Sequence, residues 1–191
     1  MNYSLPVKLI KKIYYMHLFL LFFVVFIGLI LLPFVWASVS LAPFVPTRTK
    51  DLKRIFKLAN LKQGEIFYDL GCGNGKLAIY AARKFNVKAV GIEAAWPMWL
   101  ICQWRKLFYR SKNIEFKFGN LFNENLGEAD MVYFFGMPDS IKKRLKEKLK
   151  QELKPGARVI SYAFKVPGWQ PQLVDKPSKR TASIYLYKIG D

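Results

Sequence analysis

The chain has 191 residues, 52% of them hydrophobic, which is enough for one folded domain and excludes a disordered protein. Its 31 Lys and Arg residues outnumber 13 Asp and Glu, and the net charge of +18 favours an anionic partner such as a lipid surface, a nucleic acid or an acidic protein face. The single histidine, His17, argues against Ser-His-Asp chemistry and His-rich metal sites, so no metal site is expected.

An uncharged apolar stretch follows a short basic tail at residues 1–12. No charged side chain occurs from Ile13 to Thr47, and Leu18 to Leu32 is almost wholly Leu, Phe, Val and Ile. About 20 such residues cross the ~30 Å hydrocarbon layer of a bilayer, so we predict a transmembrane helix over residues 13–36 that Pro33 bends or ends. A signal peptide and a buried core helix are the alternatives; this run is longer than a usual signal peptide and its cleavage signal is poor.

The remainder of the chain alternates between strand and helix patterns. Residues 37–61 are expected to form a linker and a short helix beginning at Asp51, and residues 62–191 one domain. Strands are expected at 65–70, 88–93, 114–118, 131–135 and 158–164, with a closing pair at 169–174 and 182–189. Helices are expected at 76–85, 97–110 and from Asp139 or Ser140 to the Lys-Pro-Gly at 154–156. This order predicts an α/β fold with a doubly wound, mostly parallel sheet of seven strands.

A glycine-rich loop follows the first strand of the domain, in the stretch "DLGCGNGK". Gly71 and Gly73 let the backbone approach a ligand closely, and Gly75 lets the next helix begin tight against the sheet. A phosphate-binding P-loop requires Gly and Ser or Thr where Leu70 and Leu77 stand, and a dinucleotide fingerprint requires Gly in place of Lys76. The spacing therefore disfavours both phosphate-binding loops.

Two acids stand at strand ends beside this loop. Asp69 would repel a pyrophosphate but attract a cation, and S-adenosylmethionine (SAM) carries an ammonium and a sulfonium and no phosphate. The pattern D-x-G-x-G-x-G resembles the first motif of the class I SAM-dependent methyltransferases. Glu93 ends the second strand, where an acid accepts hydrogen bonds from ribose hydroxyls. Asn120 follows the third strand, where that superfamily usually has an acid or amide that binds the adenine amine.

The residues expected to bind SAM therefore lie in the loop and at the following strand ends. Trp96 is included because it directly follows the Glu93 strand end. The two cysteines, Cys72 and Cys102, show neither metal nor disulfide spacing, which is typical of a reduced compartment. The full expected set is Asp69, Gly71, Cys72, Gly73, Asn74, Gly75, Glu93, Ala94, Trp96, Asn120 and Leu121.

Further segments carry a more specific resemblance. "PFVPT" after the apolar run, "VGIEAAWPMWL", "ELKPGARVIS", "PGWQP" and a terminal "YLYK" resemble the small membrane-anchored lysine methyltransferases. Eukaryotic members of that family modify the mitochondrial adenine nucleotide translocase and the ATP synthase c-subunit. The resemblance runs from about Pro43 to the C-terminus and implies a Rossmann-like methyltransferase sheet. Asn74 departs from the family pattern, which commonly has Asp there.

The resemblance also implies an acceptor channel. An acceptor lysine must be neutral although its free pKa is ~10.4; burial beside the sulfonium lowers that pKa without a dedicated base. Phe134 and Phe135 are suited to line a channel for the lysine stem. By resemblance, Pro46 and Thr47 fold over the cofactor, and a plain linker is the alternative for them. No Asn-Pro-Pro-Tyr follows the fourth strand, which argues against methylation of adenine in nucleic acid.

The favoured hypothesis is a single-pass membrane protein whose catalytic domain faces the cytoplasm, where SAM is made. It methylates an accessible lysine of a membrane or membrane-proximal protein, and the bilayer is its second partner. Two alternatives remain open, namely methylation of a lipid or other small amphiphile and a SAM-binding membrane scaffold without turnover. Basic residues flank the apolar run on both sides, so charge alone is only weak evidence for this orientation.

Overall fold

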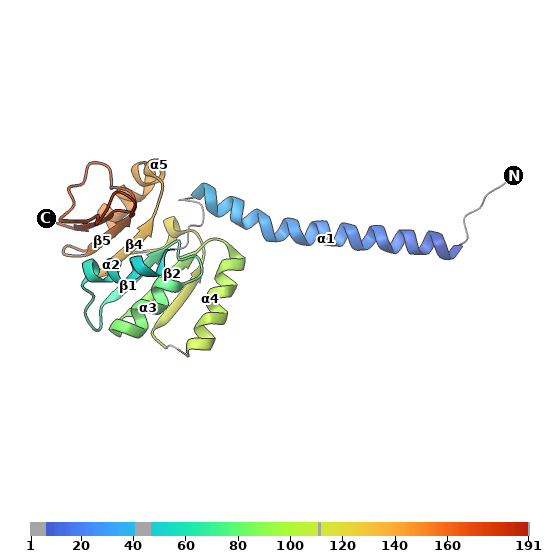
Figure 1. The fold of residues 1–191 in the computed structure, drawn as a ribbon, viewed down its shortest axis with the longest axis horizontal. Helices are drawn as coiled ribbons and strands as arrows, with labels where there is room; N and C mark the ends of the chain where they lie inside the picture. The colour runs from blue at the N-terminus through green and yellow to red at the C-terminus, as the bar shows by residue number, and fades with distance from the viewer. Residues whose placement is uncertain (1–6, 41–46, 111, 191) are drawn as a thin grey trace.

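A computed structural model describes residues 7–40, 47–110 and 112–190, apart from the side chains of 33–40. The first helix, α1 (Val7–Ser40), projects from the rest of the molecule (Figure 1). Its Val7–Leu32 part has a mean hydropathy of 2.7 and is long and apolar enough to span a bilayer, a test that a signal sequence near the N-terminus also passes. Of the two effects predicted for Pro33, a bend or the end of the helix, the second does not occur, because α1 continues to Ser40. One proline removes only one N–H donor from a long helix.

The sheet has seven strands in the order β3-β2-β1-β4-β5-β7-β6, as expected for the predicted mostly parallel α/β fold. The first five are parallel, and β7 pairs antiparallel with β5 on one side and β6 on the other. β5 ends two residues earlier than predicted because Ala163 adopts a φ of +73°. The strands are β1 (Ile66–Leu70), β2 (Lys88–Glu93), β3 (Ile114–Phe118), β4 (Met131–Phe135), β5 (Arg158–Tyr162), β6 (Leu173–Asp175) and β7 (Ile184–Lys188).

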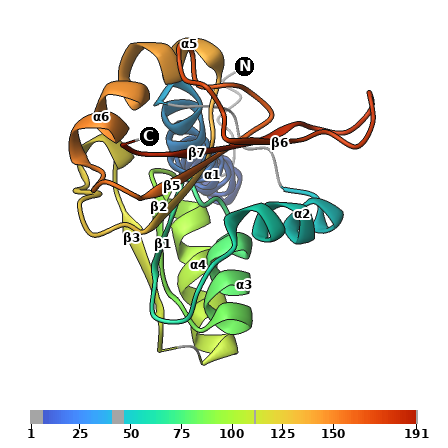
Figure 2. The ribbon, with the colours of Figure 1, turned by 90° about the vertical axis from the view of Figure 1, so that its left-hand side faces the viewer.

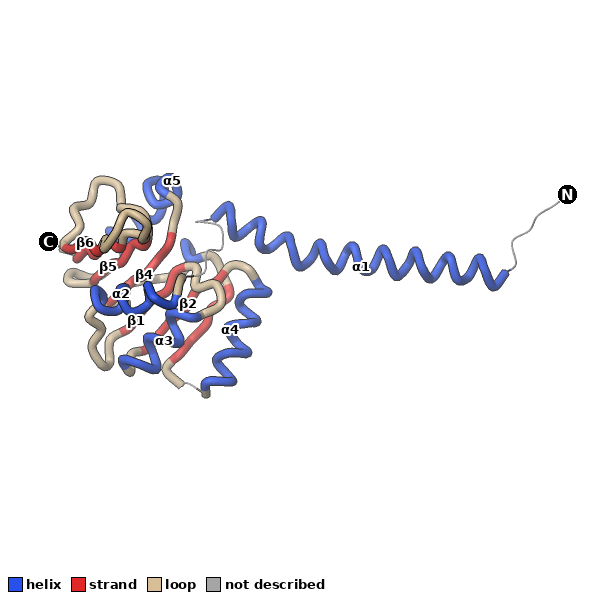
Figure 3. The backbone as a smooth tube through the Cα atoms, viewed as in Figure 1, coloured by secondary structure: helices blue, strands red, loops and turns tan. Residues whose placement is uncertain are grey.

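Helices cover both faces of the sheet (Figures 2 and 3). One layer consists of α2 (Thr49–Ala59), α3 (Lys76–Phe85) and α4 (Trp96–Tyr109). The other consists of the 3-10 turn η1 (Leu121–Asn123), the short α5 (Pro138–Ser140), the π-helical η2 (Ile141–Leu145) and α6 (Lys146–Glu152). Successive strand residues point to opposite faces, so Phe67 packs with the first layer and Tyr68 with the second.

A buried ionic network fastens α2 to the far edge of the sheet. Asp51 accepts hydrogen bonds from Arg54 and from the Tyr162 hydroxyl, both at 2.8 Å, and Arg54 also donates to Asp175 on β6. Burial opposes ionisation of Asp51, but these partners outweigh it and lower the pKa of the carboxyl. The network holds α2, and the segment that begins at Thr47, beside the sheet.

Gly91, in the middle of β2, allows close packing in the first layer. A Cβ atom there would lie 2.8 Å from both the Cys72 sulfur and a Phe116 ring carbon. We expect Gly91→Ala to lower the free energy of unfolding by about 1–3 kcal/mol through overpacking. Gly119→Ala is the matched control, because its Cβ would have nothing nearer than 3.9 Å. Thermal unfolding of the full chain in detergent, followed by circular dichroism, measures both, and equal effects would contradict this account.

Candidate active site

The glycine loop connects β1 to α3 in a conformation that other residues rarely adopt. Gly71, Gly73 and Gly75 have φ values of +76°, +54° and +71°. A Cβ atom on Gly75 would lie 2.6 Å from the Phe116 ring. The backbone N–H of Gly71 donates to the Ile92 carbonyl at 3.0 Å, which holds the bend against β2. The loop therefore leaves free backbone at the carboxyl edge of the sheet, where ligands bind in doubly wound folds.

Asp69 is a buried carboxylate without a full set of partners. Its side chain is at the end of β1, the residue is 1% exposed, and Oδ2 has no hydrogen-bond partner in the described part of the chain. Burial, and after it the nearby Glu93 carboxylate, raises the pKa of Asp69 to about 8. A cationic ligand group would supply the partner that this buried carboxylate oxygen lacks. The residues present thus fit the ammonium of SAM.

Glu93 lies beside the loop, at the end of β2. Its Oε2 accepts a hydrogen bond from the Gly73 N–H at 2.7 Å, and Oε1 accepts one from the Ala95 N–H at 2.9 Å. Burial raises the pKa of Glu93. The two hydrogen bonds stabilise the ionised carboxylate and lower the pKa, but they do not outweigh burial. The structure thus brings together the two acids singled out from the sequence. A role of Glu93 in binding the ribose hydroxyls stays a proposal.

The other predicted cofactor residues are distributed around this centre. Asn120 caps η1, with its Oδ1 accepting from the Phe122 N–H at 3.0 Å, and Leu121 is buried in the second layer. Ala94 is half-buried beyond Glu93. The Trp96 indole N–H donates to the Leu29 carbonyl of α1 at 3.2 Å.

Both cysteines are free and buried, with sulfur atoms 4.0 Å apart. The hydrogen bond with Cys102, followed by burial, raises the pKa of Cys72, so the thiol in the loop stays protonated. Cys102 donates to the Gly73 carbonyl at 3.1 Å, and Asn74 accepts at its own carbonyl from Arg105 at 2.6 Å. These contacts fix the loop from the α4 side.

Thr47 approaches the site from the N-terminal side. Its hydroxyl lies 3.2 Å from the Tyr133 hydroxyl, and Lys76 donates to the Thr47 carbonyl at 3.3 Å and to Thr49 at 2.8 Å. Pro46, predicted to share this role, lies outside the described residues. Tyr133 is not among the predicted residues, although the strand period of two places it on the same face as Asp69, its register partner across β1 and β4. Burial raises the pKa of Tyr133 strongly, so its hydroxyl keeps its proton.

The two predicted channel phenylalanines lie on opposite faces of the sheet. Phe134 is fully buried in the second layer, in the same cluster as Ile141 and Leu145. Phe135 is half-buried on the Asp69 face and contacts Tyr162 and Phe164. The pleat of β4 explains the separation, because adjacent residues of a strand cannot share a face.

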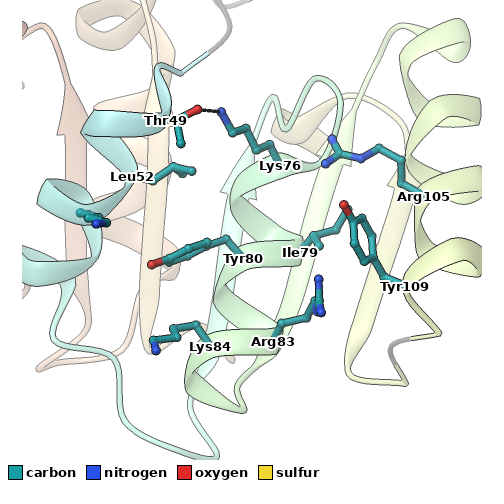
Figure 4. Close-up of a pocket in the computed structure, with 10 residues that line it drawn as sticks. Thr49, Leu52, Lys76, Ile79, Tyr80, Arg83, Lys84, Arg105 and Tyr109 are labelled. Carbon is teal, nitrogen blue, oxygen red and sulfur yellow. Dashed lines mark hydrogen bonds between the residues drawn. The ribbon is translucent and has the colours of Figure 1, made fainter.

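A basic cavity of about 490 Å³ lies between α2, α3 and α4 (Figure 4). Five of its ten lining residues are cationic and none is acidic, so it does not suit the cationic groups of SAM. Figure 4 shows Arg105 and Tyr109 of α4 directed toward α3, and the Arg83 guanidinium lies 4.7 Å from the Tyr109 ring. The lining residues are Thr49, Leu52, Lys53, Lys76, Ile79, Tyr80, Arg83, Lys84, Arg105 and Tyr109.

The fold and the acid-flanked glycine loop define a class I SAM-dependent methyltransferase. The family model of the ANTKMT methyltransferase domain matches residues 69–173, more than half of the chain. A protein-lysine N-methyltransferase of Saccharolobus islandicus is 37% identical over 78% of this chain and 94% of its own length. The chain therefore belongs to this family of protein-lysine methyltransferases, and SAM is its cofactor.

Other relatives agree with this assignment, and one solved structure agrees with the methyltransferase fold. The human lysine N-methyltransferase of the ATP synthase c-subunit is 33% identical over 69% of this chain and 56% of its own length. The mouse adenine nucleotide translocase lysine N-methyltransferase is 30% identical over 77% and 63%. An RNA methyltransferase from Salinibacter ruber, solved with S-adenosylhomocysteine (SAH), is 29% identical with a TM-score of 0.72 over 76% of this chain and 94% of that one.

If Asp69 holds the ammonium of the cofactor, its raised pKa predicts that cofactor binding depends on pH. In the free protein Asp69 is mostly protonated below pH 8, whereas a bound ammonium requires it ionised, so binding releases a proton. We expect the affinity for SAH to rise by up to about tenfold per pH unit between about pH 5.5 and 7. Asp69→Asn should bind more weakly and flatten this slope.

Isothermal titration calorimetry of the full chain in detergent measures the slope, and buffers of different ionisation enthalpy count the released protons. Asp175→Asn is the matched control, because Asp175 is on β6 in the α2 network, and it should keep the wild-type slope. A wild-type affinity that does not change across this pH range would contradict the assignment of Asp69.

Proposed function

We propose that the protein is a membrane-anchored methyltransferase that transfers methyl groups from SAM to a lysine of a membrane or membrane-proximal protein. The observation that carries the proposal is the contact of the apolar helix α1 with the start of α4. Trp96, which follows Glu93 closely in the chain, donates to the carbonyl of Leu29 in α1. The apolar helix α1 thus contacts the start of α4, next to the edge of the sheet proposed to bind the cofactor.

The names of the relatives support a lysine in a membrane protein as acceptor. The human and mouse relatives are named for the ATP synthase c-subunit and the adenine nucleotide translocase. The described side chains of α1 are almost all exposed, which supports lipid rather than protein as their surroundings. A cytoplasmic location of the catalytic domain, with the basic tail across the bilayer, follows from the supply of SAM.

The residues of the site suit methyl transfer by positioning. Bound SAM supplies an electrophilic methyl group. Asp69 would hold its ammonium, Glu93 would accept from its ribose hydroxyls, and the glycine loop would let its backbone lie close to the sheet. Asn74 and Ala94 are next to Gly73 and Glu93 in the chain. The remaining proposed binding residues are Gly71, Cys72, Trp96, Asn120 and Leu121.

The acceptor lysine must arrive neutral, and the site favours that form without a base. The hydroxyl of Tyr133 keeps its proton, and the lone histidine, His17, bonds the Ile13 carbonyl in α1. A lysine ammonium brought beside a sulfonium in a buried site is disfavoured by charge and by desolvation, so its proton leaves to solvent on entry. Thr47 and Phe135 would line its path, with Pro46; Phe134 does not suit this role because it is fully buried in the other layer.

Tritiated SAM identifies the acceptor. Native membranes incubated with the full chain should gain label in a protein band, and hydrolysis of that band should give methyllysine. Asp69→Asn is the matched inactive control. Label in the organic phase would favour a lipid acceptor and label in RNA a nucleic-acid acceptor, and either would overturn the lysine proposal. SAM binding without any transfer would instead favour a scaffold.

The Tyr133 hydroxyl offers a second test, because among the described residues its hydrogen-bond partner is Thr47 and neither of the two acids. We expect Tyr133→Phe to lower kcat about tenfold, through loss of orientation of the Thr47 segment, and to leave the affinity for SAH unchanged. Tyr185→Phe, on β7, is the matched control and should change neither. Steady-state kinetics and calorimetry separate the two effects, and a Tyr133→Phe enzyme with wild-type kcat would exclude this role.

A further inference from the structure

Helix α4 leaves a row of large apolar side chains in contact with solvent. Trp104, Leu107 and Phe108 are 67%, 76% and 71% exposed, which is unusual for residues of this size on one helix. Leu100 and Ile101 are 46% and 40% exposed. The positions recur at intervals of three and four and so form one stripe along the helix. We call these five residues the α4 apolar face.

The opposite side of α4 packs against the sheet. Trp99 and Gln103 each donate to the Phe116 carbonyl at 3.0 Å, and Cys102 between them is completely buried. These bonds fix the rotation of α4 against β3. The α4 apolar face therefore cannot turn inward to join the core, and within the described part of the chain nothing covers it.

The position of α4 relative to α1 indicates what covers this face. Figures 1 and 2, turned by 90° from each other, show α4 running crosswise to α1, on the side of the domain from which α1 projects. At about 1.5 Å per residue, the uncharged stretch of α1 that precedes Pro33, from Ile13 to Leu32, is about 30 Å long, the thickness of a hydrocarbon layer. Leu29, which binds Trp96 at the start of α4, lies within the last turn of that part.

We propose that the α4 apolar face docks on the bilayer surface, with α4 lying in the plane of the interface. A helix with Trp, Phe and Leu on one side and basic residues beside them has the composition of interfacial helices. Arg110, exposed at the C-terminal end of α4, would meet anionic headgroups. The proposal rests on the membrane anchorage proposed above. It places the cofactor edge at the membrane surface and so selects acceptor lysines close to the headgroups.

A hydrogen-bond donor missing from α1 strengthens the connection between the two helices. Pro33 has no N–H, so the Leu29 carbonyl lacks the donor that an α-helix normally supplies from four residues later. The Trp96 indole N–H provides that hydrogen bond at 3.2 Å. In a membrane, where water cannot replace a lost donor, this bond holds the first residue of α4 at the depth of Leu29.

Spin labelling of the full chain tests the docking. Single cysteines are introduced in place of Leu107 on the face, Leu20 in the middle of α1 and Lys150 on α6, all exposed. Cys72 and Cys102 are buried, and the unsubstituted chain measures their background labelling. Each labelled chain is placed, one copy per disc, in lipid nanodiscs containing anionic lipid. Collision rates with oxygen, which partitions into lipid, and with a water-soluble nickel chelate then report the depth of each label.

The expected result is a high oxygen-to-nickel ratio at Leu20, an intermediate one at Leu107, several-fold above Lys150, and a water-like one at Lys150. A double Trp104→Glu, Phe108→Glu variant should bring the Leu107 ratio to that of Lys150 and leave Leu20 and the affinity for SAH unchanged. If the label at Leu107 is as exposed to water as the label at Lys150 while the label at Leu20 is in lipid, the docking is overturned and the anchorage is not. Leu20 in water would overturn both. A Leu107 label shielded from both reagents would indicate a protein partner and also overturn the docking.

Discussion

The structure depends on keeping two carboxylates away from water at a bend made of glycine. Burial raises the pKa of Asp69 to about 8 in the free protein, which corresponds to a cost on the order of 5 kcal/mol for its ionised form. A bound ammonium offsets that cost, whereas a phosphate would increase it. The same buried charge that would destabilise an empty site therefore selects a cationic cofactor.

Much of this arrangement follows from local sequence patterns. The strand-loop-helix from Ile66 to Phe85, the second acid at Glu93 and the alternation of strands and helices along the chain depend on periodicity and on glycine, which act over a few residues. Local conformation also explains the small errors. The pattern misplaces the end of β5 because Ala163 takes a left-handed conformation, which no residue-type preference predicts.

Contacts between distant segments are not predictable in this way. Tyr133 reaches Thr47 across 86 positions, and Asp51 reaches Tyr162 across 111. Helix α4 is apolar on both sides, so its sequence does not say which side faces the core; hydrogen bonds from Trp99 and Gln103 to β3 decide that. The place of Trp96 in the sequence predicts a position beside the cofactor. That position stays a prediction. The hydrogen bond from its N–H to α1 was not predicted, and the only feature of the sequence that indicates it is Pro33, which has no N–H to donate to Leu29.

A tether alone would not orient a methyltransferase toward a lysine in a membrane. A helix along the bilayer normal keeps the domain at the surface and raises its effective concentration toward membrane acceptors, but it leaves rotation and tilt of the domain undetermined. A second contact along a different axis removes the tilt. The hydrogen bond between Trp96 and Leu29 fixes one end of α4. From that end the α4 apolar face runs in a direction crosswise to the axis of α1. Glu93 lies three residues before this end of α4 and accepts a hydrogen bond from the Gly73 N–H of the glycine loop. Fixing α4 would therefore also fix the direction in which a cofactor bound at that loop presents its methyl group.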